Sequence, residues 1–168
     1  MGEGNGMAIS RRALIGAGGG AVAAAWLWSA GGRSAAMRYE VTLTDAQWRG
    51  KLSPAAYEVL RHAATERAFT SPLLKEHRKG IFACAGCELP LFSSATKFES
   101  GTGWPSFWAP LRNAVLTSND TSIGMDRTEV HCRRCGGHLG HVFDDGPKPT
   151  GLRYCMNGVA LTFIPART

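Results

Sequence analysis

Apolar residues follow a helical spacing before residue 80 and a different pattern after it. The run Thr44-Asp-Ala-Gln47 is a capping box, and Ser53-Pro54 supplies a cap with proline in the first helical position. Apolar side chains then recur every three or four residues, beginning at Tyr57 and Leu60. The pattern predicts an introductory helical segment with one helix from about Pro54 to Ala64, which packs Tyr57 and Leu60 on the domain.

From residue 81 onward, short apolar segments are broken by glycine, proline, asparagine and aspartate, and no helical period is long enough to predict a helix. This pattern is typical of an antiparallel β domain. One domain is expected, because the 168 residues contain no long internal repeat and no low-complexity linker after the N-terminal segment. The predicted strands are Gly80 to Ala83, Asn113 to Thr117, Arg127 to His131, Leu139 to Phe143, Arg153 to Met156 and Val159 to Ile164.

The first 36 residues have the pattern of a twin-arginine export signal. Ser10-Arg11-Arg12 precedes a weakly apolar stretch from Ala13 to Ala30, in which eleven of eighteen residues are glycine or alanine. Small residues at Ser34-Ala35-Ala36 suit a signal peptidase, so we expect residues 1–36 to be removed and a domain to span residues 37–168. An uncleaved membrane anchor is the alternative, because eighteen residues just reach spanning length. The expected location is periplasmic or exported, with a membrane partner only if the leader is retained.

The distribution of charge argues against a nucleic-acid-binding surface. The formal net charge is +6, but three of the nineteen basic and one of the thirteen acidic residues precede Met37, which leaves sixteen basic and twelve acidic residues after it. These basic residues are scattered, apart from the short pair Arg133-Arg134. Such scatter is typical of a solvated surface, and no nucleic acid partner is expected.

Four of the five cysteines form two matched C-x-x-C pairs, which predict a structural zinc ion. Four sulfur ligands complete a tetrahedral zinc site and leave no open position for chemistry. Two redox dithiols or two disulfides are alternatives, as is a mixed site that uses His131, but the duplicated spacing favours zinc with His131 as a bystander. The predicted ligands are Cys84, Cys87, Cys132 and Cys135.

Cys155 is the remaining cysteine, so the thiol reactivity of this chain is expected there. It lies in a strand-like stretch in which alternation places Arg153, Cys155 and Asn157 on one face. A neighbouring arginine favours the thiolate, which is the reactive form of the side chain. An inert buried thiol is the alternative, and it describes most free cysteines.

Two imidazoles and a carboxylate follow the second cysteine pair closely. His138, His141 and Asp145 could form an acid–base wall near the Cys155 sulfur, since the metal needs neither histidine. The run Gly101-Thr-Gly-Trp-Pro-Ser-Phe107 is unusually rich in glycine and aromatic residues for a turn. Its tryptophan, Trp104, could line an apolar pocket, and alone it would as often be a core anchor.

These ordered motifs together closely resemble those of the B-type methionine-R-sulfoxide reductases. The resemblance rests on the two C-x-x-C pairs, Gly-Thr-Gly-Trp-Pro-Ser-Phe, His-Leu-Gly-His-Val-Phe-Asp-Asp-Gly-Pro and Arg-Tyr-Cys-Met-Asn, and it runs from about Val41 to Ile164. It implies a mainly β, antiparallel β-tent-like domain with short N-terminal helices and a structural zinc ion away from the active site. It also implies reduction of the R epimer of methionine sulfoxide, with oxidised proteins or peptides favoured as substrates.

The resemblance further implies a role for each candidate residue. Cys155 matches the nucleophile, which attacks the sulfoxide sulfur and becomes a sulfenic acid as methionine departs. Trp104 resembles the aromatic residue that packs on the S-methyl group of the substrate. Proton delivery and positioning of the sulfoxide oxygen are implied for His138, His141, Asp145, Arg153 and Asn157.

One departure from the resemblance concerns the reductant. Many relatives carry a second, resolving cysteine in the glycine-rich loop, where this chain has Thr102, and there is no sixth cysteine. With four cysteines bound to zinc, none can form a disulfide with Cys155. The sequence therefore predicts an external reductant, such as a thioredoxin-like protein, a small thiol or a membrane-linked partner.

Three rival functions stay open from the sequence. A zinc-stapled β-tent domain can serve as a binding module without catalysis, although such a module would not require Cys155, His138 and His141 together. A zinc ribbon that binds nucleic acid is disfavoured by the scattered charge. A general disulfide oxidoreductase is disfavoured because the C-x-x-C pairs come as a metal-binding set.

Overall fold

The computed structural model describes residues 38–122 and 124–167. The expected twin-arginine leader of residues 1–36, its cleavage or retention as an anchor, and the start of the mature domain at Met37 lie outside these residues. Within them, none of the helices combines the length and the apolar character that crossing a membrane requires.

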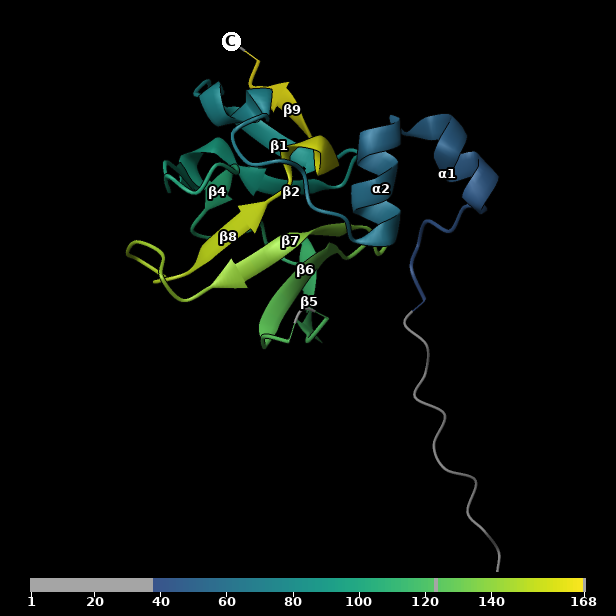
Figure 1. The fold of residues 1–168 in the computed structure, drawn as a ribbon. Helices are drawn as coiled ribbons and strands as arrows, with labels where there is room; N and C mark the ends of the chain where they lie inside the picture. Colours follow the sequence, from purple (N-terminus) through teal and green to yellow (C-terminus); the bar gives the residue numbers. More distant parts are fainter. Residues whose placement is uncertain (1–37, 123, 168) are drawn as a thin grey trace, which may run out of the picture. The chain divides into compact units, whose positions relative to one another are not determined.

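Two short helices precede the strands, and both begin where the sequence predicts (Figure 1). Helix α1 (Asp45–Lys51) has the full capping box: the Thr44 hydroxyl accepts from the Gln47 backbone N–H, and the Gln47 side chain accepts from the Thr44 backbone N–H. Helix α2 (Pro54–His62) is capped by the Ser53 hydroxyl, which accepts from the Ala56 N–H. The capping predictions are thus confirmed.

Helix α2 packs on the β domain through the side chains that its spacing marked as apolar. Tyr57 and Leu60 are each only 2% exposed, which confirms the predicted packing face. The helix ends at His62 rather than Ala64, because Ala63 adopts the left-handed conformation with φ 54° and stops the helical ladder. A 3-10 turn, η1 (Pro72–Lys75), follows before the first strand.

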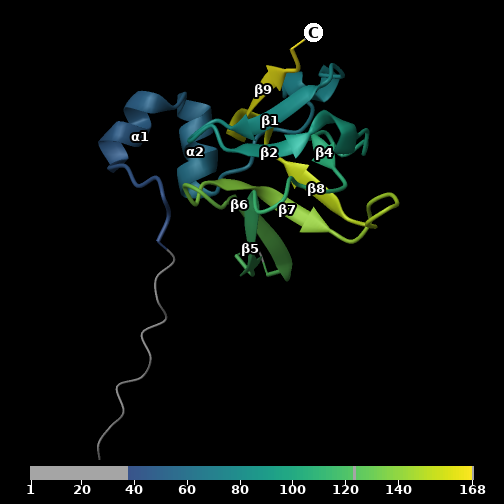
Figure 2. The same cartoon turned by 180° about the vertical axis from the view of Figure 1, so that it is seen from behind.

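Two antiparallel sheets form the framework of the described chain, as expected for a mainly β domain (Figures 1 and 2). The smaller sheet has the order β2-β1-β9, with β1 (Gly80–Cys84), β2 (Pro90–Ser93) and β9 (Leu161–Pro165). The larger sheet has the order β3-β4-β8-β7-β6-β5. Its strands are β3 (Lys97–Phe98), β4 (Ser106–Phe107), β5 (Val115–Asp120), β6 (Arg127–Cys132), β7 (His138–Phe143) and β8 (Arg153–Met156).

Each predicted strand overlaps an observed strand, but two begin two residues too early, the one predicted to end at Thr117 continues to Asp120, and several other bounds differ by one residue. The strand expected from Asn113 begins instead at Val115, since Asn113 has a left-handed φ of 55° and belongs to a turn. The strand expected from Val159 begins at Leu161, because Gly158–Ala160 form a 3-10 turn, η3. The sequence missed β2, β3 and β4, which have four residues or fewer and too little alternation to detect.

An aromatic cluster joins the two sheets. The Phe92 ring of β2 stacks on the Phe107 ring of β4 at 4.4 Å between centroids, and Phe82 of β1 meets Phe107 edge-on at 5.0 Å. All three side chains are fully buried, as are Leu139 and Met156. This core fixes β4, β8 and β7 side by side, and β8 carries Cys155 (Figure 2).

Candidate active site and metal centre

The four predicted zinc ligands lie together in space. Cys84 ends β1 and Cys132 ends β6, and each strand is followed by a turn that carries the second cysteine of its pair. The Sγ atoms of Cys84 and Cys135 are 3.7 Å apart, those of Cys87 and Cys132 are 3.4 Å apart, and all four atoms lie within 4.8 Å of one another. The fold therefore brings two segments that are distant in sequence into one cluster of sulfur atoms.

This cluster fits a zinc ion. Zn–S bonds of about 2.3 Å in a tetrahedron place sulfur atoms about 3.8 Å apart, close to the spacing in the cluster. Hydrogen bonds from the Cys135 and Cys84 thiols lower the pKa of Cys132, which favours a thiolate there. Across residues 38–122 and 124–167, the ligand cluster consists of cysteines, and His131 stays outside it as the sequence expected.

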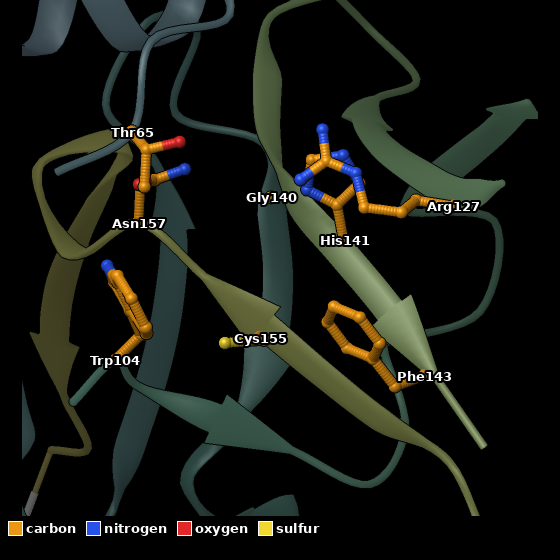
Figure 3. A pocket seen from close by; sticks show the side chains of 8 residues that line it. All are labelled: Thr65, Trp104, Arg127, Gly140, His141, Phe143, Cys155 and Asn157. Carbon is orange, nitrogen blue, oxygen red and sulfur yellow. The ribbon is translucent and has the colours of Figure 1, made fainter. Parts of the chain in front are cut away.

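Cys155 opens onto a pocket of about 120 Å³ in the middle of the larger sheet (Figure 3). On β8 it lies opposite His141 of β7 and opposite Ser106 of β4. Gly140 permits this approach, because a Cβ atom there would lie 2.1 Å from the Cys155 carbonyl oxygen. Figure 3 shows the Cys155 sulfur between the Trp104 and Phe143 rings. The pocket is lined by Thr65, Trp104, Arg127, Gly140, His141, Phe143, Cys155 and Asn157.

Each of the two predicted histidines is held by a carboxylate. His141 Nε2 lies 2.7 Å from Asp120 Oδ2, and His138 Nδ1 lies 2.7 Å from Glu129 Oε1. Only His141 lines the pocket; His138 is 5% exposed and packs against His141 with ring centroids 5.4 Å apart. Burial lowers the pKa of His138 despite the Glu129 carboxylate, which favours its neutral form. The structure thus places His141 at the sulfur and His138 behind it.

Arg127 is a pocket residue that the sequence did not single out. Its Nη2 atom donates to Asp120 Oδ2 at 2.5 Å, so Asp120 binds both Arg127 and His141. Figure 3 shows the Arg127 guanidinium over the His141 ring, on the side of the pocket across from Trp104. A cation and an imidazole therefore share one carboxylate beside the sulfur.

Arg153 and Asp145 form an ion pair outside the lining of the pocket. Arg153 Nε and Nη2 donate to the two Asp145 carboxylate oxygens at 2.8 and 2.7 Å. This pairing raises the pKa of Arg153, and the nearby Cys155 contributes in the same direction. The guanidinium also lies 4.4 Å from the centroid of the Phe143 ring. Arg153 thus supports a pocket wall, while Asp145 orients Arg153.

Trp104 and Asn157 are both fastened to one residue of the loop after α2. Trp104 Nε1 donates to the Glu66 carbonyl oxygen at 2.9 Å, and the Glu66 N–H donates to Asn157 Oδ1 at 2.8 Å. The Asn157 Nδ2 atom donates to the Leu139 carbonyl oxygen at 3.1 Å, and the Glu66 carboxylate accepts from the Gly158 N–H at 2.6 Å. The amide of Asn157 is therefore engaged in holding the pocket together.

Residues 52–165 match the SelR domain. The chain belongs to the SelR domain family. Relatives that are 51–58% identical to it carry the name peptide methionine sulfoxide reductase MsrB. The protein from Leptospira interrogans is 54% identical over 128 residues, which are 76% of this chain and 98% of that protein. The protein from Thiobacillus denitrificans is 58% identical over 123 residues, or 73% and 93% of the two chains. The protein from Agrobacterium fabrum is 51% identical over 127 residues, or 75% and 94%.

Sequence reasoning missed several residues of the SelR pocket. Phe143 stood inside a recognised motif two residues after His141, so strand alternation places both on one face, but it was assigned no role. Arg127 and Asp120 begin and end strands that pair with each other, so their contact depends on strand register. Glu66 acts mostly through its backbone, and a motif search cannot detect such a role.

Proposed function

We propose that this SelR domain reduces methionine sulfoxide to methionine with Cys155 as the nucleophile. The observation that carries the proposal is the position of the Cys155 sulfur, which faces a small pocket between two aromatic rings with an imidazole opposite it. The relatives named peptide methionine sulfoxide reductase MsrB support the same reaction. Because the His141 imidazole lines the same pocket as the Cys155 thiol, the reductase function is favoured over a binding module without catalysis.

One cysteine thiol is sufficient to balance the reduction of one sulfoxide. The Cys155 thiolate attacks the sulfoxide sulfur, the sulfoxide oxygen is protonated, and oxygen passes to the cysteine, so that thiol plus sulfoxide gives sulfenic acid plus thioether. His141 is the candidate acid, since it lines the pocket directly opposite Cys155. Asp120 fixes the imidazole and, through Arg127, places a positive charge near the oxygen. His138 and Glu129 support His141 from behind.

The aromatic walls suit the apolar part of the substrate. Trp104 and Phe143 flank the Cys155 sulfur and can pack on the methyl and methylene groups next to the sulfoxide. A pyramidal sulfoxide that places its methyl group on an aromatic wall and its oxygen near His141 presents one configuration at sulfur. We propose that this configuration is the R epimer, and that the pocket takes it from oxidised proteins and peptides.

We further propose a structural zinc ion and an external reductant. Cys84, Cys87, Cys132 and Cys135 would hold the ion, which would cross-link the turns after β1 and β6. In the glycine-rich loop, the Oγ1 atom of Thr102 lies 3.7 Å from the Cys155 sulfur, and a hydroxyl cannot form a disulfide. The sulfenic acid would therefore react with two external thiols, giving a disulfide, water and the free Cys155 thiol.

Separated epimers of a peptide methionine sulfoxide test this function. With dithiothreitol as reductant, we expect the purified protein to convert the R epimer to the thioether and to leave the S epimer at the rate of a no-enzyme control. Product would be followed by reversed-phase chromatography. Equal conversion of both epimers would contradict the proposed pocket, and conversion of neither would contradict the function.

A further inference from the structure

Three hydroxyl groups form a chain that starts at the Cys155 sulfur and ends at a backbone carbonyl. Thr102 Oγ1 lies 3.7 Å from Cys155 Sγ and 2.9 Å from Ser100 Oγ. Ser100 Oγ lies 2.7 Å from Ser106 Oγ, and Ser106 donates to the Trp104 carbonyl oxygen at 3.1 Å. Each distance lies within hydrogen-bonding range, so the four side chains are connected without a gap.

The fold holds this chain of hydroxyls in place. Ser106 is 1% exposed and lies directly opposite Cys155 in the pairing of β4 with β8. Gly103 has a left-handed φ of 93°, and a Cβ atom there would lie 2.9 Å from the backbone nitrogen of Phe69. The glycine-rich loop is therefore pinned against the loop after α2, and Thr102 is presented to the sulfur from a fixed position.

Each hydroxyl has one proton to donate, so the hydrogen bonds along this chain of hydroxyls can run in either of two directions, which we call its two polarities. When Ser106 donates to the Trp104 carbonyl, Ser100 donates to Ser106 and Thr102 donates to Ser100, so that Thr102 can only accept a proton from the Cys155 thiol. When the three hydroxyls reverse, Ser106 gives up its hydrogen bond to the Trp104 carbonyl and donates to Ser100, Ser100 donates to Thr102, and Thr102 donates to the Cys155 thiolate. One polarity therefore matches the thiol and the other matches the thiolate.

The Trp104 carbonyl oxygen, at which the chain of hydroxyls ends, excludes a role in proton release. A backbone carbonyl accepts hydrogen bonds but does not take up a proton, so the chain cannot carry the Cys155 proton away. That proton must leave on the pocket side, where His141 lies. The chain is thus a reversible donor to the sulfur rather than a proton exit.

We propose that Thr102 is a catalytic residue that stabilises the Cys155 thiolate by donating a hydrogen bond to it, and that Ser100 and Ser106 position Thr102 for this role. The proposal rests on the proposed function in taking Cys155 as the nucleophile. It assigns to these three side chains the stabilisation of the negative charge from the β4 side of Cys155, across β8 from His141. A hydrogen bond to a charged sulfur favours the ionised form.

The pH dependence of Cys155 alkylation tests the proposal without turnover. We would measure the rate of iodoacetamide modification of the Cys155 peptide by mass spectrometry, in zinc-loaded protein, from pH 5 to pH 10. Thr102→Val keeps the shape of the side chain and removes the hydroxyl. In this variant we expect the midpoint pH, at which the alkylation rate is half its maximum, to rise by about one unit. In Thr102→Ser, the matched control, the midpoint should stay with the wild-type protein. Ser100→Ala, which leaves Thr102 without its support, should give a smaller rise.

The outcomes separate this proposal from the reductase function. A Thr102→Val midpoint equal to that of the wild-type protein would overturn the role of Thr102, even if the protein reduces sulfoxides normally. A raised midpoint would support it, even in a protein whose substrate is different. If Thr102→Val does not fold, as judged by far-UV circular dichroism, Thr102→Ala compared with Thr102→Ser supplies the same decision.

Discussion

Replacement of Cys155 by serine is expected to lower the rate of sulfoxide reduction by about 10⁴-fold or more, because the hydroxyl is a poor nucleophile toward sulfur and no other thiol faces the pocket. The four remaining cysteines are clustered at the ends of β1 and β6 and in the turns that follow, where they could hold a metal ion. The measurement is kcat/KM for the R epimer with dithiothreitol, alongside zinc content and thermal unfolding.

The controls make this result specific to the nucleophile. Cys155→Ser should retain about one zinc ion per chain and a wild-type melting temperature, since Cys155 is half-buried and lies outside the metal cluster. Activity within tenfold of the wild-type protein would remove Cys155 from the mechanism. Loss of zinc together with activity would show that Cys155 supports the fold instead.

Loss of one metal ligand is expected to destabilise the whole domain. In Cys132→Ala the zinc site would lose a buried thiolate that joins the turns after β6 and β1, and structural zinc contributes an apparent ~10–16 kcal/mol in small domains. This contribution is comparable to the net stability of a typical domain. We expect the variant to lose zinc and its cooperative thermal transition.

A matched comparison distinguishes the metal from ordinary core packing. Cys155→Ala removes the same atoms outside the cluster and should keep the transition. Chelation of zinc from the wild-type protein should reproduce the Cys132→Ala phenotype and should be reversed by added zinc. A Cys132→Ala protein that unfolds cooperatively at the wild-type temperature would contradict a structural role for the metal.

The sequence predicts the parts of this molecule that depend on local spacing. The helix caps at Thr44 and Ser53 and the apolar face of α2 follow from residues close together in the chain, and the structure confirms them. The meeting of the two C-x-x-C turns joins distant segments, but it was predicted from the matched spacing within each pair. Boundaries failed where one residue entered the left-handed region, as Ala63 and Asn113 do. Local patterns do not reveal such single-residue conformations.

In the site, too, residues within local motifs were predictable, and contacts between distant strands were not. Four predicted site residues line one pocket, namely Cys155, His141, Trp104 and Asn157, whereas the structure places Arg153, Asp145 and His138 around that pocket instead. Asp120, Arg127 and Glu129 could not be predicted, because the contacts of Asp120 and Glu129 with the histidines, and of Arg127 with Asp120, depend on the register of β5, β6 and β7. The chain of hydroxyls that reaches the sulfur from β4 likewise depends on the pairing of β4 with β8.

A single-turnover experiment tests the solitary nucleophile most directly. Reduced, zinc-loaded protein would be mixed with the R epimer in the absence of added thiol, and the intact chain would be analysed by mass spectrometry after trapping with dimedone. We predict one equivalent of thioether, one dimedone adduct on Cys155 and zinc still bound. An internal disulfide that includes Cys155, or thioether formed without modification of Cys155, would contradict the account.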